Sequence, residues 1–239
     1  GFTGDEIEKR VSSHGLSPDF IKLIHGQSRI NIKMKHVEET EINASGPTIE
    51  KEDLEKLYVK REHLTEGDIL ILSGSMASGV DHNFYADVMK YLEGRKIRVV
   101  VDAAGSILKT VLPYHPYLIK PNQHELSEIF GQKILENQVE EYACKLVTMG
   151  AQNVLVSLGE NGAILVNKQV YRSIAPRGEI LNSVGAGDSM IAAFLASKLN
   201  GESDQIALEK SVAMGSATAF SYGIAEQEAA DILYKEMVK

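Results

Sequence analysis

The stretch Asp68-Ile69-Leu70-Ile71-Leu72-Ser73 decides the fold, because it is the first of four apolar runs that alternate with amphipathic segments. Short runs rich in Ile, Val and Leu are typical of strands that are buried on both faces of a parallel sheet. The remaining runs are Ile97–Asp102, Tyr117–Lys120 and Asn153–Leu158. The sequence therefore predicts four strands of one sheet.

Amphipathic segments connect these runs. Residues 83–93, 123–130 and 138–149 have apolar positions at helical spacing. The segments stop at Gly94, Gly131 and Gly150, and glycine is the usual signal at a helix C-terminus. Strands that alternate with helices form a largely parallel sheet with helices on both faces. We therefore expect an α/β fold.

Composition limits the classes of function. A chain of 239 residues with 44% hydrophobic residues can bury the core of one α/β domain. The formal net charge of −8 argues against a surface for nucleic acid or an anionic membrane. A single cysteine, Cys144, on an apolar helical face indicates a core residue in a reducing compartment. No apolar run approaches the ~20 residues of a membrane span, and no signal peptide precedes the first residues, so we expect a cytoplasmic protein.

A glycine-rich turn leads into a helix at Asn182-Ser183-Val184-Gly185-Ala186-Gly187-Asp188-Ser189. Backbone N–H groups at Ala186, Gly187 and Asp188 are expected to be free to bind an anion at the positive end of the helix dipole. A carboxylate at this place can also take a proton from an attacking hydroxyl, which suggests a kinase. The alternative is a tight turn in which Asp188 only caps the helix.

Unusual residues follow the predicted strands at their carboxyl ends, where α/β sheets bind their ligands. Gly74-Ser75 follows the first strand, and Asp102 ends the second. Lys120-Pro121-Asn122 follows the third strand, and Gly159–Gly162 follows the fourth. Asn122 with Glu125 three residues later also has the spacing of a capping box, and both a capping and a binding role can hold at once.

The segment Arg29-Ile30-Asn31-Ile32-Lys33-Met34-Lys35 alternates polar and apolar residues with a period of two. As a strand it presents Arg29, Asn31, Lys33 and Lys35 on one face. It is either an edge strand protected by its charges or a lid over an anionic substrate. Gly46-Pro47 predicts a hinge between residues 1–46, with lid strands at about 29–45, and a core at residues 47–239 within one domain overall.

Taken together, these segments resemble the ribokinase-like (phosphofructokinase B type) family of carbohydrate kinases. The stretches that carry the resemblance are Arg29–Lys35 with Glu39–Asn43, Gly74–Val80, Lys120–Leu126, Ser157–Ala163, Val184–Ser189 and Ala217–Ala225. They follow the family's order along nearly the whole chain, which is far more specific than a single turn. The resemblance implies a three-layer α/β/α sandwich with a mostly parallel sheet and a small β lid.

The resemblance also assigns roles to matched positions. It implies Asp188 as the catalytic base and an anion hole at Gly185, Ala186 and Gly187. It places Lys120 and Asn122 at the phosphates of ATP, Glu125 at Mg²⁺, and Ser157, Gly159 and Gly162 beside the adenine and ribose. It assigns Arg29 to the phosphate already on the sugar, helped by Asn31 and Lys33, and Gly74 and Ser75 to a substrate loop in which the usual prolines are replaced by Ala77-Ser78. The resemblance also allows a K⁺ ion near the anion hole.

Within the family, the motifs are most similar to the branch that phosphorylates fructose 1-phosphate at C6 to give fructose 1,6-bisphosphate. The runner-up is phosphorylation of tagatose 6-phosphate at C1. Gly1–Asp5 matches an interior segment of the family, so the first strands, a sugar-binding aspartate and a glycine pair are expected to lie outside this sequence. A nucleotide-binding module without turnover is therefore the alternative from another class. The expected partners are ATP and a small sugar phosphate, with a homodimer through the lid strands also allowed by the pattern.

Overall fold

The computed structural model describes residues 1–35, 39–103 and 105–239, and the side chains outside residues 33–41 and 104. Its centre is a six-stranded sheet in the order β3-β4-β5-β6-β7-β8. The strands are β3 (Ile69–Ser73), β4 (Arg98–Asp102), β5 (Leu118–Ile119), β6 (Val154–Ser157), β7 (Ala163–Val166) and β8 (Val170–Ser173). The first four lie within the predicted runs and pair in parallel, as predicted. The predicted burial holds for β4, β5 and β6 but not for β3, in which Ile71 is 47% exposed.

The sheet also contains two strands that the sequence patterns did not indicate. β7 pairs antiparallel with both β6 and β8. The β7–β8 connection is a short turn in which the side chain of Asn167 accepts the N–H of Gln169 at 3.0 Å. The sheet is therefore parallel from β3 to β6 and antiparallel beyond, with Leu165 of β7 fully buried.

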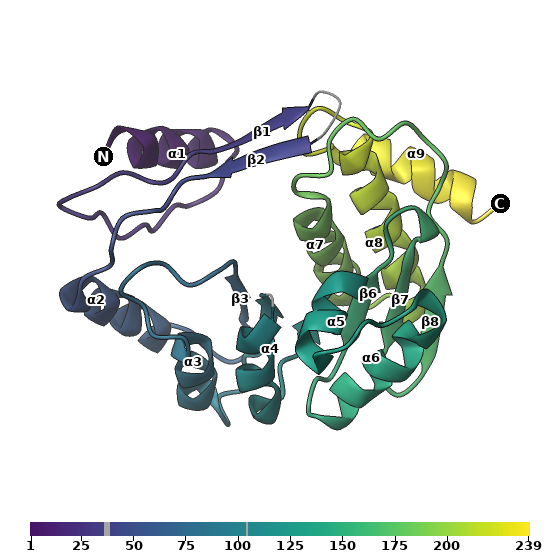
Figure 1. Cartoon of the computed structure of the whole chain (residues 1–239), viewed down its shortest axis with the longest axis horizontal. Coiled ribbons are helices and arrows are strands. Elements are labelled where there is room, and N and C mark those ends of the chain that lie inside the picture. Colours follow the sequence, from purple (N-terminus) through teal and green to yellow (C-terminus); the bar gives the residue numbers. More distant parts are fainter. Residues whose placement is uncertain (36–38, 104) are drawn as a thin grey trace.

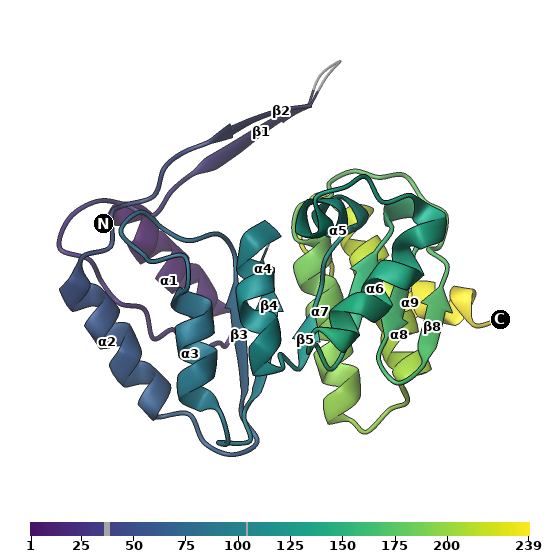
Figure 2. The ribbon, with the colours of Figure 1, turned by 60° about the horizontal axis from the view of Figure 1, so that its bottom comes forward.

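Helices cover the two faces of the sheet and make three layers (Figures 1 and 2). One face packs against α3 (Phe84–Leu92), α4 (Gly105–Val111), α5 (Gln123–Phe130) and α6 (Val139–Thr148). The other face packs against α7 (Ala186–Leu199) and α8 (Asp204–Ala219). Successive residues of β4 alternate between these layers, since Val99 and Val101 belong to the first core and Val100 to the second.

The helix boundaries agree with the glycine signals. α3, α5 and α6 lie within the predicted segments. Gly131 is the residue that ends α5, with a left-handed φ of 66°, a conformation that glycine adopts without strain. Cys144 of α6 packs against the first core, as its apolar helical face predicts. Short 3₁₀ turns cover Leu112–Tyr114, Glu136–Gln138 and Gly159–Asn161.

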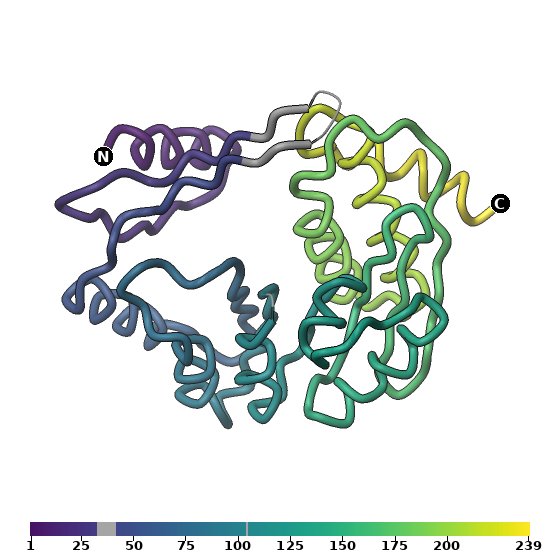
Figure 3. The backbone as a smooth tube through the Cα atoms, in the orientation of Figure 1, coloured from purple at the N-terminus to yellow at the C-terminus, as the bar shows by residue number. Residues whose placement is uncertain are grey.

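The remaining helices lie at the two ends of the chain and beside α3. α1 (Phe2–Ser13) begins at the N-terminus, and α9 (Gln227–Met237) packs against α8. α2 (Lys51–Glu62) lies beside α3, where the rings of Tyr58 and Phe84 are 5.7 Å apart. The two termini lie at opposite sides of the molecule (Figure 3). None of the helices in the described part of the chain is long and apolar enough to cross a membrane.

The alternating segment forms a separate antiparallel ribbon. β1 (Asn31–Lys35) pairs with β2 (Glu39–Asn43), with Asn31 opposite Asn43. The ribbon projects away from the body (Figure 2) and is not part of the six-stranded sheet. Ile30, Ile32 and Ile42 are about half exposed or more. The segment is therefore not an edge of the main sheet, and the small β lid of the implied architecture is present as a two-stranded sheet.

Candidate active site

The glycine-rich turn begins α7 as the sequence predicts, but Asp188 is not its cap. Gly185 is the N-cap, with a φ of 81°, and no side chain caps the helix. Asp188 is the third residue of the helix and is exposed. The alternative in which Asp188 serves only as the N-cap is therefore wrong. Its carboxylate stands at the open, positive end of the helix.

Two backbone N–H groups remain available at this helix start. Those of Gly187 and Asp188 donate to no acceptor in the described part of the chain. The Ala186 N–H lies 3.3 Å from the carbonyl oxygen of Ser183, so the expectation of three free groups is corrected to two. We call residues Gly185–Asp188 the cradle. Two amides beside a helix terminus are suited to bind an oxyanion.

Hydrogen bonds connect the residues just before the cradle to the end of α8. The backbone N–H groups of Leu181 and Asn182 both donate to the carbonyl oxygen of Ala219, at 2.8 and 3.1 Å. The side chain of Asn182 accepts from the N–H of Val184 at 3.1 Å and donates to the carbonyl oxygen of Tyr222 at 3.2 Å. These bonds fix the turn before any ligand binds.

Lys120 reaches the cradle from the end of β5. It is 8% exposed, and its ammonium lies next to Gly187. A Cβ atom on Gly187 would stand 2.8 Å from Lys120 Nζ and 3.0 Å from Lys120 Cε. The lysine thus occupies the space that a side chain at position 187 would fill, so a larger residue there would displace the ammonium. The packing brings a buried cation to the start of α7.

Asp102 at the end of β4 is the acidic partner of this lysine. Lys120 Nζ and Asp102 Oδ1 are 3.4 Å apart, and the two side chains are 9% and 17% exposed. Burial raises the pKa of the Asp102 carboxyl, Lys120 opposes the shift, and the negative charge of Asp188 adds to it. The two aspartates and the lysine thus share one electrostatic environment.

Asn122 and Glu125 form the capping box that their spacing predicts. The side chain of Asn122 accepts the N–H of Glu125 at 2.8 Å, and Glu125 Oε2 accepts the N–H of Asn122 at 2.7 Å. This leaves Glu125 Oε1 and the side-chain amide nitrogen of Asn122 without a partner among the described residues. No cluster of three or more His, Cys, Asp or Glu in the described part of the chain could hold a metal ion by itself.

The loop after β6 is close to Asn122 through a bridge between Asn122 and Ser157. Gly162 has a φ of 86°, and a Cβ there would lie 2.0 Å from the carbonyl oxygen of Ser173. Gly159 has a φ of 58° with open space around the Cβ position. Gly162 is thus fixed by the close approach of β8, whereas Gly159 presents a bare backbone to open space.

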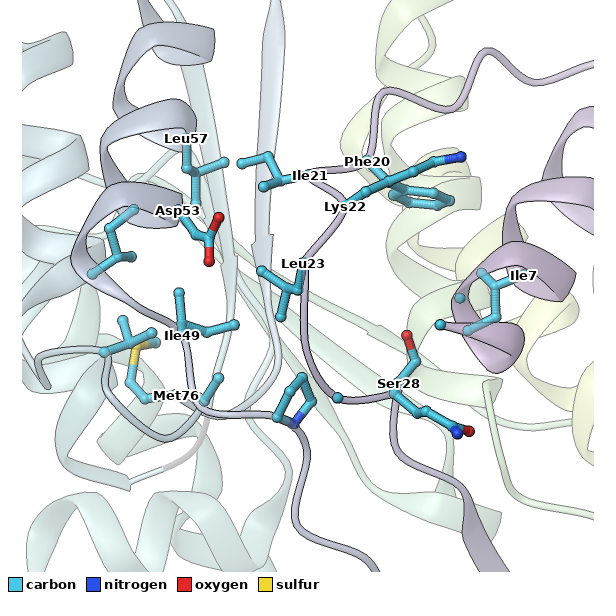
Figure 4. Close-up of a pocket in the computed structure, with 18 of the residues that line it drawn as sticks. Ile7, Phe20, Ile21, Lys22, Leu23, Ser28, Ile49, Asp53, Leu57 and Met76 are labelled. Atoms are coloured by element: carbon cyan, nitrogen blue, oxygen red, sulfur yellow. The ribbon is translucent and has the colours of Figure 1, made fainter.

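The residues predicted to bind the sugar lie in other parts of the fold than the cradle, in the loop after β3 and at the ribbon. Gly74 has a φ of 93°, its N–H donates to the carbonyl oxygen of Asp102 at 3.0 Å, and Ser75 is exposed. Ser75 lines a cavity of about 630 Å³. Ser28, labelled in Figure 4, lines the same cavity. Arg29 follows Ser28 directly and is exposed, as is Asn31 at the base of the ribbon.

These sugar-side residues do not reach the cradle through any described contact. No described hydrogen bond or ion pair joins Arg29 or Asn31 to Gly185–Asp188, and the side chain of Lys33 lies outside the described residues. The structure therefore brings together the cradle, Lys120 and Asp102. Asn122, two residues after Lys120, is bridged to Ser157.

The model of a family described as "pfkB family carbohydrate kinase" matches residues 1–230. The chain belongs to this family. The match covers both the segment before β1 and the cradle, in agreement with the resemblance found from the motifs.

Curated relatives of this pfkB chain are sugar-phosphate kinases by name. It is 41% identical to "1-phosphofructokinase" of Bacillus subtilis over 245 residues, covering 99% of this chain and 78% of the relative. It is 34% identical to "D-tagatose-1-phosphate kinase" of Bacillus licheniformis over 229 residues, covering 95% of this chain and 75% of the relative. The chain thus spans about three quarters of the length of these two relatives.

A solved structure confirms the fold of the pfkB chain. Phosphofructokinase-2 from Escherichia coli, in complex with substrates and products, superposes with a TM-score of 0.94 over 100% of this chain and 80% of that chain. The sequence identity is 24%, and this likeness supports the three-layer α/β architecture.

Asp102 ends a predicted strand of this pfkB chain, but no motif assigns it to the site. The side chain gains its importance from the parallel register, in which Ser73 pairs with Asp102 and Val101 with Ile119. This register sets the Asp102 carboxylate beside Lys120, which follows Ile119. An aspartate that ends an otherwise apolar strand was the one available signal.

Proposed function

We propose that this chain transfers the γ-phosphoryl group of ATP to the C6 hydroxyl of a ketohexose 1-phosphate, with fructose 1-phosphate as the first substrate to test. The observation that carries the proposal is the exposed Asp188 carboxylate beside two free N–H groups and the buried ammonium of Lys120. The name of the relative with 41% identity, 1-phosphofructokinase, supports the choice of fructose.

The chemistry assigns complementary roles to these groups. Asp188 takes the proton of the C6 hydroxyl as its oxygen forms a bond to the γ-phosphorus, and the bond from that phosphorus to the β,γ-bridging oxygen breaks to release ADP. The N–H groups of Gly187 and Asp188, with Lys120, bind the oxygens of the group in transfer. Gly185 and Ala186 shape the turn that holds these donors in place.

Mg²⁺ fits the donor set as a companion of the nucleotide. Such an ion keeps several waters and is bound by one or two carboxylates together with substrate phosphates. Glu125 Oε1 is available for this role, and the amide of Asn122 is available for a phosphate oxygen. When bound, the ion neutralises charge on the β- and γ-phosphates. Lys120 and Asn122 thus form the phosphate side of the proposed nucleotide site.

The remaining assignments belong to the same proposal. Ser157, Gly159 and Gly162 lie along the proposed adenine and ribose path, where the open face of Gly159 allows close approach. Arg29 is assigned to the sugar's existing phosphate because a guanidinium can hold two of its oxygens. Asn31, Lys33, Gly74 and Ser75 are assigned to the same substrate, which requires the ribbon to come over the strand ends.

Two further elements of the proposal concern ions and assembly. K⁺ is a candidate ion near the cradle. The exposed isoleucines Ile30, Ile32 and Ile42 favour a homodimer through the ribbon, since apolar side chains on a two-stranded ribbon gain stability when a second copy covers them.

A survey of four acceptors tests the proposal. ADP release would be measured with fructose 1-phosphate, tagatose 1-phosphate, fructose 6-phosphate and tagatose 6-phosphate. Fructose and tagatose differ only in configuration at C4, so we expect turnover with both 1-phosphates and the higher kcat/KM with fructose 1-phosphate. Preference for a 6-phosphate would contradict the assignment of C6 as the acceptor.

A second function, nucleotide binding without turnover, is favoured because no described hydrogen bond or ion pair joins Arg29 or Asn31 to the cradle. Calorimetry distinguishes the two. Binding of ATP with Mg²⁺ but of none of the four sugar phosphates supports the module, whereas binding of both ligands supports the kinase.

A further inference from the structure

Asp102 makes two independent interactions, one through its backbone carbonyl and one through its side chain. Its carbonyl oxygen accepts the N–H of Gly74 at 3.0 Å, and its carboxylate lies 3.4 Å from the ammonium of Lys120. The register places Asp102 beside Ser73, so the residue stands between the Gly74 turn and the end of β5. It is thus the structural connection between the proposed sugar loop and the cation at the cradle.

The pair is unusual for its burial. Its side chains are 9% and 17% exposed, and every other ion pair among the described residues is more exposed. The Lys96–Glu66 pair, at 72% and 68%, is a typical surface pair. Burial of two charges is costly, and burial of one without its partner is costlier still. The cost of burying this pair therefore requires a compensating interaction that an exposed pair does not need.

The location of the ammonium gives the reason for the pair. Lys120 Nζ lies against Gly187 at the start of α7, where the helix dipole presents its positive end. A cation alone at this end is repelled, so without an anion nearby the lysine would be expected to leave. The Asp102 carboxylate supplies the compensating charge when no phosphate is bound.

We propose that Asp102 is a positioning residue that holds the Lys120 ammonium against Gly187 before the nucleotide binds, and that through its carbonyl oxygen it ties the Gly74 turn to the same point. The inference rests on the proposed function for its effect on rate. Its geometric part, the dependence of Lys120 on Asp102, does not need turnover.

A double-mutant cycle of Asp102→Asn and Lys120→Met tests the proposal, because it measures whether Asp102 acts through Lys120. With fructose 1-phosphate as acceptor, we expect Asp102→Asn to lower kcat roughly tenfold or more with a much smaller change in KM for ATP. In the Lys120→Met background the same substitution is expected to change kcat less than about twofold. Asp102→Glu should recover part of the rate.

The cycle is repeated on ligand affinity, so that the inference is tested even if the chain has no turnover. Calorimetry with AMP-PNP and Mg²⁺ gives the dissociation constant of all four proteins. We expect Asp102→Asn to change the affinity in the presence of Lys120 and not in the Lys120→Met background. Absence of turnover in the wild type with a coupled affinity cycle would overturn the proposed function and leave the positioning role supported.

Controls separate positioning from folding. Glu66→Gln removes the partner of the exposed Lys96 pair and should leave both readouts unchanged. The double variant carries no unpaired buried charge, so it can still be compared with Lys120→Met if Asp102→Asn alone unfolds, and a difference in kcat well above twofold between these two would overturn the proposal. Equal effects of Asp102→Asn with and without Lys120, on rate or on affinity, would overturn the proposal.

Discussion

The hydroxyl of Thr218 donates a hydrogen bond to the hydroxyl oxygen of Ser189 at 2.9 Å, and both residues are buried. Thr218 lies near the end of α8, and Ser189 follows Asp188 in the first turn of α7. The same threonine oxygen accepts the N–H of Ala225 at 3.2 Å. One buried side chain therefore connects the helix that carries Asp188 to α8 and to the segment after it.

Replacement of this side chain tests whether the cradle is held in place in advance. Thr218→Val keeps the shape but leaves the Ala225 N–H without its acceptor, and we expect a loss of about 1–3 kcal/mol in the free energy of unfolding. The kcat should fall with it, because the cradle loses a fixed support. Urea unfolding and steady-state kinetics measure the two effects.

Thr110→Val is the matched control. Its hydroxyl donates only to the carbonyl oxygen of Ile107 within α4, at 2.8 Å. We expect a smaller loss of stability and an unchanged kcat. Equal kinetic effects of the two substitutions would show that Thr218 has no special connection to the cradle.

The pH dependence of stability gives a second prediction, centred on Asp102. Burial raises the pKa of its carboxyl in the folded chain. As the pH falls, the folded chain therefore takes up this proton before the unfolded chain, whose ordinary value is about 3.9. The ionised carboxylate reduces stability above the folded pKa, and this reduction disappears as the pH falls through that pKa towards the unfolded value.

Comparison with the Asp102→Asn/Lys120→Met double variant isolates this effect, since other carboxylates cancel in the difference. Urea unfolding from neutral to acidic pH should show the wild type gaining stability relative to the variant as the pH falls. Comparison with Glu202→Gln should show the opposite trend. Hydrogen bonds from Lys210 and Ser197 lower the pKa of Glu202, so the wild type should lose stability relative to that variant as the pH falls. A wild type that loses stability relative to the double variant would contradict the sign derived for Asp102.

Two glycines of the loop after β6 allow a structural role to be separated from a binding role. A methyl group on Gly162 meets both a positive φ and the carbonyl oxygen of Ser173 at 2.0 Å. Gly162→Ala should therefore cost about 3 kcal/mol or more of stability. Gly159→Ala meets only a positive φ in open space, with an expected cost of about 1–2 kcal/mol.

Affinity for AMP-PNP completes this comparison. If the nucleotide passes close to the bare backbone of Gly159, the Gly159→Ala variant loses affinity out of proportion to its small loss of stability. Calorimetry on folded protein gives the answer. Unchanged affinity would remove Gly159 from the proposed nucleotide path.

Much of the fold follows from local patterns. Each of the four apolar runs, of which Asp68–Ser73 is the first, contains one strand of the sheet, and Gly131 ends α5 where the sequence predicts. The antiparallel strands β7 and β8 were not predicted. The run Ala163–Val166 has only four apolar residues and could belong to a strand or to a buried helix. Such short segments are defined by their neighbours rather than by their own period.

The site divides in the same way. The turn at Gly185–Asp188 and the capping box of Asn122 and Glu125 are local, so spacing alone predicts them. The pairing of Lys120 with Asp102 depends on the register of adjacent strands, and the contact with Gly187 on the packing of α7 against the sheet. Both are separated in sequence, and no single segment contains their signal.

If Asp188 is the base for transfer to C6, the Asp188→Asn variant should bind nucleotide but transfer the phosphoryl group slowly. Phosphorus NMR would follow the product of ATP and fructose 1-phosphate, while calorimetry follows the affinity for AMP-PNP. We expect a new phosphate ester at C6 with the wild type, a rate lower by roughly 10² to 10⁴ in the variant, and nearly equal affinities. A variant that forms the C6 ester at the wild-type rate would contradict this role of Asp188.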